Sequence, residues 1–82
     1  MDFVIARRGK PPVAIECKWS ASEFDPAAMK IFRTAYPDGA SFVVTADLCG
    51  AHPYTRRYGP LSVTFVSLED LIASLARPGD DR

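Results

Sequence analysis

The stretch Val13-Ala14-Ile15-Glu16-Cys17-Lys18-Trp19 decides how the rest of this chain is interpreted. Its residues favour a β-strand, in which successive side chains point to opposite faces. Glu16 and Lys18 are then expected to share one face, while Cys17 and Trp19 point the other way, into the core. A carboxylate and an ammonium inside an apolar strand are costly unless they pair, bind a metal or act on a substrate. From this strand alone, an ordinary surface ion pair is the simplest interpretation.

The residues before this strand predict a β-hairpin. The run at 2–6 (DFVIA) favours a strand, and the run at 7–12 (RRGKPP) is typical of a turn in which Gly9 supplies a positive φ. In such a hairpin each residue of the first strand lies opposite one residue of the second. Asp2 shares a face with Glu16 and Lys18 only if the two residue numbers of each opposing pair add up to an even number. That register requires a loop of odd length or a β-bulge. With it, Asp2, Glu16 and Lys18 form one cluster.

Downstream of the hairpin the pattern predicts a helix and then an interior strand. Asp25-Pro26 is a good helix start, with Asp as N-cap and Pro in the first turn. Lys30 and Arg33 are expected on the solvated side of this helix. The near-continuous apolar run at 41–46 favours an interior strand, joined to the first by a parallel crossover. The apolar stripe expected to face the sheet is Ala28, Ile31, Phe32, Ala35 and Tyr36.

The last third of the chain predicts a turn-rich segment at 47–60, a fourth strand at 62–66 and a final helix with Ser67 as N-cap. The fold class is therefore α/β, with a small mixed four-stranded sheet in the order β-β-α-β-β-α. The stripe expected to be buried on the final helix is Leu68, Leu71, Ile72 and Leu75.

Length and composition predict one small soluble domain. The chain has 82 residues, which favours a single domain at 1–77 with a frayed tail at 78–82. Lys plus Arg and Asp plus Glu both number 10, so no overall field attracts nucleic acid, although a local basic surface can form. Cys17 and Cys49 lack metal-ligand spacing and a secretory context, which favours reduced thiols in a cytoplasmic protein. No apolar run is long enough to span a membrane, and no membrane partner is expected.

Asp2, Glu16 and Lys18 together have the composition of a metal-dependent phosphodiesterase site. Mg²⁺ is commonly held by one or two carboxylates, waters and a substrate phosphate. Asp2, Glu16 and the backbone carbonyl of Cys17 supply ligands for Mg²⁺ or Mn²⁺. Lys18 then orients the attacking water or offsets charge on the phosphate. The same spacing also occurs by chance, so a surface ion pair stays open at this point.

Asp2-Phe3-Val4, followed by Gly9 and by Ile15-Glu16-Cys17-Lys18, resembles the core of the PD-(D/E)xK nuclease superfamily, which has the restriction-endonuclease-like fold. The longer runs at 2–20 (DFVIARRGKPPVAIECKWS) and 59–72 (GPLSVTFVSLEDLI) are similar to one branch of it. That branch is a C-terminal domain of unknown function in bacterial and archaeal AAA+-type ATPases. The resemblance implies DNA as the polymer acted on and Asp2, Glu16 and Lys18 as the active-site positions.

The sequence departs from this superfamily at its N-terminus. The superfamily core begins with a helix before the strand that carries the Asp, and here Met1 directly precedes Asp2. The chain is therefore interpreted as an N-terminally truncated fragment that lacks the first helix. A homodimer or an upstream ATPase module is expected to cover the sheet face left open.

Three functions follow from these observations. The first is a Mg²⁺-dependent DNA endonuclease-type domain, and the second is a non-catalytic DNA-binding or protein-interaction remnant of the same fold. The third is an interaction module whose Glu16–Lys18 pair is only surface charge. His52 is expected to lie in a surface loop without a catalytic role. The candidate nucleic-acid contacts are Arg8, Lys10, Arg56 and Arg57, the last two flanked by Tyr54 and Tyr58.

Overall fold

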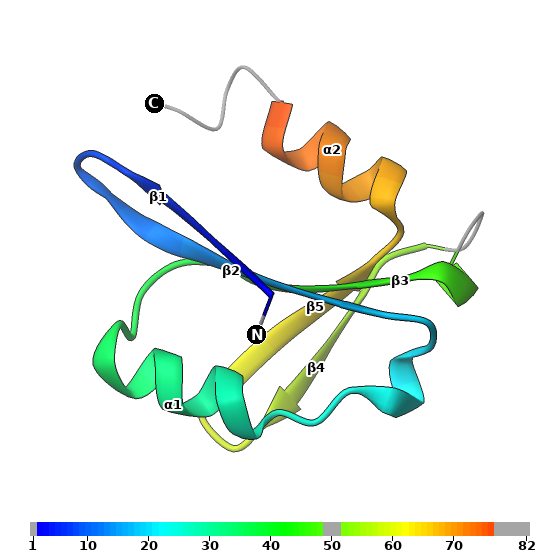
Figure 1. The fold of residues 1–82 in the computed structure, drawn as a ribbon, viewed down its shortest axis with the longest axis horizontal. Helices are drawn as coiled ribbons and strands as arrows, with labels where there is room; N and C mark the ends of the chain where they lie inside the picture. The colour runs from blue at the N-terminus through cyan, green and yellow to red at the C-terminus, as the bar shows by residue number, and fades with distance from the viewer. Residues whose placement is uncertain (1, 49–51, 77–82) are drawn as a thin grey trace.

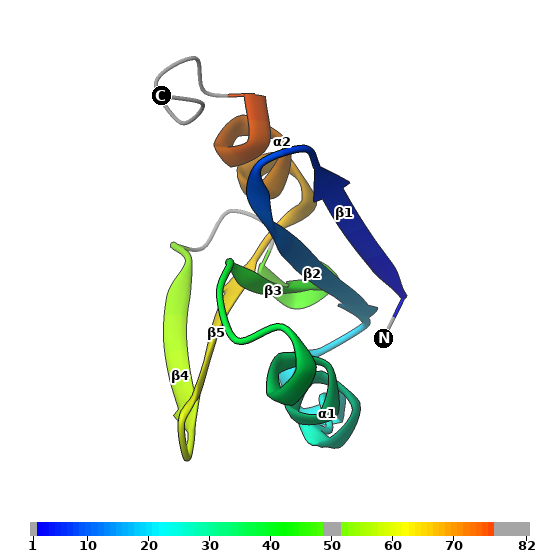
Figure 2. The same ribbon diagram turned by 90° about the vertical axis from the view of Figure 1, so that its left-hand side faces the viewer.

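A mixed sheet with a helix on each face forms the domain (Figures 1 and 2). The computed structural model describes residues 2–48 and 52–76. The sheet has five strands in the spatial order β1-β2-β3-β5-β4. The strands are β1 (Phe3–Arg7), β2 (Lys10–Lys18), β3 (Ser41–Thr45), β4 (Tyr54–Tyr58) and β5 (Leu61–Val66). The helices are α1 (Ala27–Ala35) and α2 (Leu68–Ala76), with short 3-10 turns η1 (Ala21–Glu23) and η2 (Ala46–Leu48).

The expected four-stranded sheet in the order β-β-α-β-β-α is corrected to five strands in the order β-β-α-β-β-β-α. The additional strand is β4, which lies in the segment predicted to be turns and pairs antiparallel with β5. Its two arginines hide the strand pattern, because neither face of β4 is uniformly apolar. The Tyr54 ring stacks on Phe65 with centroids 5.0 Å apart, and this cross-strand contact anchors β4 to the sheet.

The β1–β2 hairpin has the register that the candidate site requires. Phe3 pairs with Ile15 and Val4 with Ala14, so the paired numbers have the even sum that the cluster of Asp2, Glu16 and Lys18 requires. A bulge between Ile5 and Arg7 allows this register with a short turn, in which Gly9 has a φ of 74°. Beyond the hairpin, β2 runs parallel to β3, and β3 runs parallel to β5, which confirms the predicted crossover.

The two sheet faces carry separate hydrophobic cores. On the α1 face, Met29 and Phe24 pack with apolar residues of β2, β3 and β5. On the α2 face, Leu71 packs with Val13, Ile15 and Val66. Residues two apart in a strand share a face, which is why the even-numbered residues of β2 lie on the α1 face and the odd-numbered ones on the α2 face.

The predicted buried stripe of α1 is correct only at Phe32. Met29, Phe32 and Arg33 face the sheet, whereas Ile31 is 74% exposed. The other expected core residues of this helix, Ala28, Ala35 and Tyr36, are exposed as well. Compared with the prediction, the helix is rotated about its axis so that Arg33, expected on the solvated side, is buried. Arg33 donates hydrogen bonds to the Tyr36 carbonyl at the end of α1 and to the Pro12 carbonyl in β2.

The predicted helix starts are close to those observed. Asp25 Oδ1 accepts a hydrogen bond from the Ala27 amide at 3.0 Å, and α1 begins at Ala27, one residue after Pro26. Ser67 Oγ accepts from the Asp70 amide at 3.1 Å, which confirms Ser67 as the N-cap of α2. The predicted buried stripe of α2 is correct only at Leu71, because Leu68, Ile72 and Leu75 are exposed.

Neither α1 nor α2 is long and apolar enough to cross a membrane. The predicted tail at 78–82 and Cys49 lie outside the described residues.

Candidate active site at the end of β2

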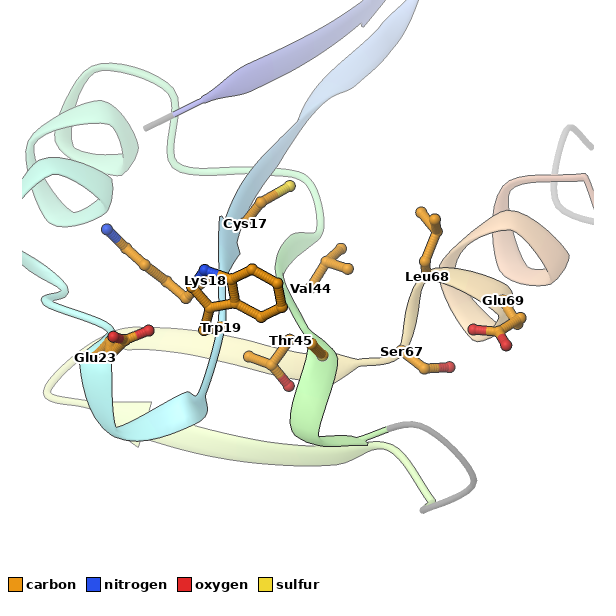
Figure 3. Close-up of a pocket in the computed structure, with 10 residues that line it drawn as sticks. Cys17, Lys18, Trp19, Glu23, Val44, Thr45, Ser67, Leu68 and Glu69 are labelled. Atoms are coloured by element: carbon orange, nitrogen blue, oxygen red, sulfur yellow. The ribbon is translucent and has the colours of Figure 1, made fainter.

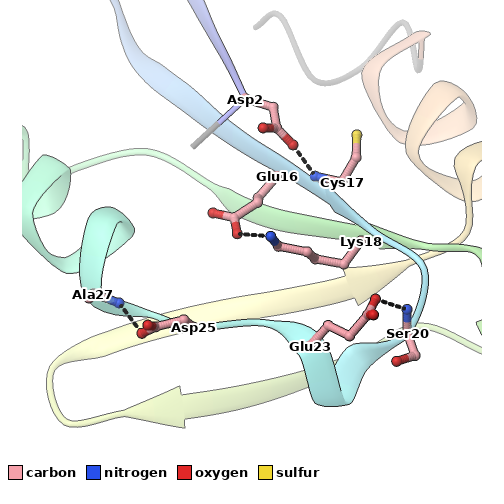
Figure 4. Close-up of polar contacts among 8 residues, drawn as sticks. All are labelled: Asp2, Glu16, Cys17, Lys18, Ser20, Glu23, Asp25 and Ala27. Carbon is pink, nitrogen blue, oxygen red and sulfur yellow. Dashed lines mark hydrogen bonds and ion pairs between the residues drawn. The ribbon is translucent and has the colours of Figure 1, made fainter.

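Glu16 and Lys18 lie side by side on the α1 face at the carboxyl end of β2. Lys18 Nζ is 3.6 Å from Glu16 Oε2 (Figure 4). The Glu16 residue is only 6% exposed, whereas the Lys18 side chain is 37% exposed. The predicted shared face is therefore confirmed. The pair is not the simple surface ion pair of the alternative interpretation, because a buried carboxylate keeps its charge only when a cation or hydrogen-bond donors lie close to it.

Asp2 joins this segment through the backbone. Asp2 Oδ2 accepts a hydrogen bond from the Cys17 amide at 2.8 Å (Figure 4). The pair of Phe3 and Ile15 is the last in the β1–β2 ladder, so the Cys17 amide lies just beyond it. The Asp2 carboxylate accepts the hydrogen bond that a backbone carbonyl would accept if the ladder continued. This contact holds a second carboxylate beside the peptide group that follows Glu16.

The Cys17 carbonyl shares this edge of β2. In an antiparallel ladder the N–H and C=O groups of one residue point to the same neighbouring strand. Because the Cys17 amide points toward Asp2, its carbonyl points toward the same edge. The Asp2 and Glu16 carboxylates and this carbonyl are hard oxygen ligands of the kind that Mg²⁺ prefers. A Mg²⁺ or Mn²⁺ ion held by such oxygens would complete its coordination with waters and a substrate phosphate.

The described residues contain no group of three or more His, Cys, Asp and Glu side chains arranged to hold a metal ion. A site here therefore depends on two carboxylates and backbone oxygen rather than on a closed cage of side chains. This composition suits Mg²⁺, which usually keeps several waters, and does not suit structural Zn²⁺, which takes four Cys or His ligands.

Cys17 and Trp19 are exposed, which corrects the prediction that both point into the core. Cys17 has the predicted strand phase, whereas Trp19 lies just beyond the end of β2, and the α2 face is open there. Partial desolvation raises the pKa of the Cys17 thiol, and the negative charges of Asp2 and Glu16 raise it further. Cys17 is therefore a poor nucleophile at neutral pH.

The four candidate nucleic-acid contacts do not gather at this site. Arg8 lies in the hairpin turn and Lys10 begins β2, roughly 20 Å along the strand from Glu16. Arg56 and Arg57 lie on β4, which is separated from β2 by two strands, roughly 14 Å across the sheet. As neighbours in a strand, Arg56 and Arg57 also point to opposite faces.

An open groove of about 770 Å³ lies where β2, β3 and β5 end (Figure 3). The carboxyl ends of parallel strands are the usual place for ligands in open α/β sheets. The groove includes Lys18 and Cys17 and therefore borders the cluster of carboxylates described above. Its lining residues are Cys17, Lys18, Trp19, Glu23, Val44, Thr45, Ala46, Ser67, Leu68 and Glu69.

The sequence interpretation missed three polar residues at or near this site. Thr45 pairs with Lys18 across the ladder and is 2% exposed, and its hydroxyl has no hydrogen-bond partner among the described residues. Glu23 lines the groove, and its Oε1 accepts from the Ser20 amide at 3.2 Å. Glu69 lines it from α2. In the sequence, only the position of Thr45 at the end of an interior strand points to a site. His52 is exposed outside the helices and strands, as expected for a surface residue.

Comparison of the chain with protein-family models, with curated proteins and with solved structures gave no significant match.

Proposed function

We propose that this chain is a Mg²⁺-dependent DNA endonuclease-type domain that hydrolyses phosphodiester bonds. The observation that carries the proposal is the position of Asp2, whose carboxylate binds the peptide group between Glu16 and Lys18. Three chemically suitable groups thus meet at one end of β2, as the resemblance to PD-(D/E)xK nucleases implies. The alternative of pure surface charge does not account for a nearly buried Glu16 beside a second carboxylate.

Each residue has a distinct role in the proposed reaction. Asp2, Glu16 and the Cys17 carbonyl would hold Mg²⁺ or Mn²⁺, which would supply Lewis-acid polarisation of the phosphate and of a water. Lys18 is exposed enough to reach a phosphate and stabilises the negative charge that develops on its oxygens. The water oxygen attacks phosphorus and gives up a proton to solvent, while the bond to the leaving oxygen breaks and that oxygen takes a proton from solvent.

Conversion of supercoiled plasmid to open circles tests the activity. With Mg²⁺ or Mn²⁺ we expect nicking that EDTA stops and that Lys18→Ala or Glu16→Gln reduces about 100-fold or more, as for other residues that stabilise transition-state charge. The matched control is Lys30→Ala, which changes an exposed lysine on α1. Equal nicking by the parent chain and Lys18→Ala, with circular dichroism showing both folded, would contradict the proposed site.

A non-catalytic DNA-binding or protein-interaction remnant of the same fold is the second candidate. The observation that favours it is the Lys18–Glu16 contact, which already neutralises both charges in the metal-free chain. DNA binding without cleavage in the presence of Mg²⁺ and Mn²⁺ supports this alternative over the nuclease.

The proposed partners follow from the same fold. Exposed apolar residues on the α2 side, including Ile72 and Leu75, fit a second copy of the chain or an upstream ATPase module as the covering surface. DNA as substrate and the free thiol of Cys17 fit a cytoplasmic protein.

A further inference from the structure

Trp19 is the most exposed large hydrophobic residue in the described part of the chain, at 78%. It is also the single tryptophan of the sequence. Its backbone is held firmly, since the Trp19 carbonyl accepts hydrogen bonds from the Ala46 and Asp47 amides, both at 3.2 Å. The ring therefore stands out from a fixed point between the ends of β2 and β3.

The indole lies within the groove at the carboxyl ends of the strands. Figure 3 shows it between Lys18 and Glu23 on one side and Val44 and Leu68 on the other. A flat aromatic face beside apolar Val44 and Leu68 suits a planar, uncharged ring better than a phosphate. The groove, at about 770 Å³, is within the range of sites that bind small organic groups.

The charges of the groove favour a base over the phosphate backbone. Lys18 is the only basic residue among the described residues that line the groove, and it already lies 3.6 Å from Glu16. Glu23 and Glu69 are acidic and repel phosphates, whereas they accept hydrogen bonds from the exocyclic amino groups of bases. A nucleic acid strand can therefore place one phosphate near Lys18 and an adjacent base in the groove.

We propose that Trp19 is a stacking platform for an unpaired nucleobase next to the phosphate that the site acts on. The substrate class is accordingly DNA with single-stranded or frayed nucleotides, because a base inside an intact duplex is already stacked on its neighbours. This inference rests on the proposed nuclease function, and it names the form of DNA that the site accepts.

Fluorescence of the single tryptophan reports directly on this groove. The test titrates the full chain with a ten-nucleotide oligo(dC), with a blunt duplex of the same length and with an abasic oligonucleotide, all in Ca²⁺ with DNA integrity checked on a gel. We expect saturable quenching by oligo(dC) and little by the duplex or the abasic strand. Equal quenching by all three overturns base stacking, and no quenching while labelled oligo(dC) binds shows that DNA lies elsewhere.

Variants separate stacking from a structural role of Trp19. Fluorescence anisotropy of labelled oligo(dC) measures the affinity of each variant for this strand. Trp19→Ala should bind oligo(dC) about 5-fold to 150-fold more weakly, which is the range for the loss of one base–aromatic stack. Trp19→Phe should retain most of the affinity, and the matched control Tyr36→Ala removes another exposed aromatic without effect. Equal loss in Trp19→Ala and Tyr36→Ala would overturn the assignment.

The plasmid assay keeps this inference distinct from the proposed function. Nicking by the parent chain together with unchanged Trp19 fluorescence leaves the nuclease intact and overturns the stacking platform. Quenching by oligo(dC) without any nicking supports the platform and favours the non-catalytic remnant.

Discussion

At the scale of single residues, the Asp2–Cys17 contact is the one on which the candidate site depends most. It is a single hydrogen bond of 2.8 Å between a side chain and a backbone amide. The same geometry places the Asp2 charge near the Cys17 thiol, where it contributes to the raised pKa of that group. Cys17 therefore reports on the position of Asp2 without any requirement for catalysis.

We expect Asp2→Asn to increase the rate at which iodoacetamide alkylates Cys17. Removing one nearby negative charge lowers the pKa of the thiol, so the reactive thiolate fraction at pH 8 rises; desolvation, the larger cause of the shift, remains. Peptide mass spectrometry separates Cys17 from Cys49, and Asp47→Asn is the matched control. An unchanged or slower rate in Asp2→Asn would show that Asp2 does not lie beside Cys17.

At the scale of elements, Arg33 joins the end of α1 to the start of the parallel sheet. Its Nε donates to Ser41 Oγ at 2.9 Å, its Nη1 to the Tyr36 carbonyl at 3.1 Å and its Nη2 to the Pro12 carbonyl at 3.0 Å. Further bonds reach the Asp38 and Ala40 carbonyls. One guanidinium thus satisfies carbonyls from β2, from the end of α1 and from the loop before β3.

Arg33→Ala should lower the free energy of unfolding by about 3 kcal/mol or more. The substitution leaves several partly buried carbonyls without their donor, and each such loss is costly. Urea unfolding followed by circular dichroism measures the change. Lys30→Ala, an exposed change on the same helix, should stay within about 0.5 kcal/mol. Equal stability of the two variants would show that the Arg33 network contributes little.

Gly39 shows how tightly the same junction is packed. It has a φ of 112°, and a Cβ placed there would lie 2.2 Å from the Pro12 carbonyl oxygen. That oxygen is also an acceptor for Arg33. The glycine therefore permits the close approach of the loop to β2 that brings the carbonyls within reach of Arg33.

At the scale of the whole molecule, the two faces of the sheet are covered unequally. The α1 face buries Met29, Val43, Val63 and Phe65 completely. On the opposite side, α2 buries Leu71 and leaves its other large apolar residues exposed. The large hydrophobic residues exposed on that side are Phe3 of β1 and Leu68, Ile72 and Leu75 of α2.

We expect the chain to form a reversible dimer through the α2 side. Ile72→Glu should weaken self-association at least about tenfold, because burying one such side chain contributes roughly 1.5–3 kcal/mol. Sedimentation velocity over a range of concentrations measures the effect. The matched control is Ile31→Glu, which changes an exposed isoleucine on α1. A parent chain that stays monomeric at high concentration would contradict the predicted dimer.

The sequence by itself determined the features that depend on local alternation and local caps. Glu16 and Lys18 share a face because strand side chains alternate. The sequence states which hairpin register would bring Asp2 to them, and the structure supplies that register through a bulge between Ile5 and Arg7. Ser67 caps α2 because its hydroxyl reaches an amide three residues away. All these features involve neighbours in the chain or in one hairpin.

Only the tertiary structure decided which surfaces are covered. Cys17 has the strand phase of core residues and Trp19 lies just beyond the end of β2, but both are exposed because the α2 face is open there. Arg33 looks like a surface residue in sequence, but it is buried because carbonyls from two distant segments converge on its guanidinium. β4 forms because it pairs with the free edge of β5 and because the Tyr54 ring stacks on Phe65. Burial depends on what packs from elsewhere in the chain, and alternation along one strand does not encode it.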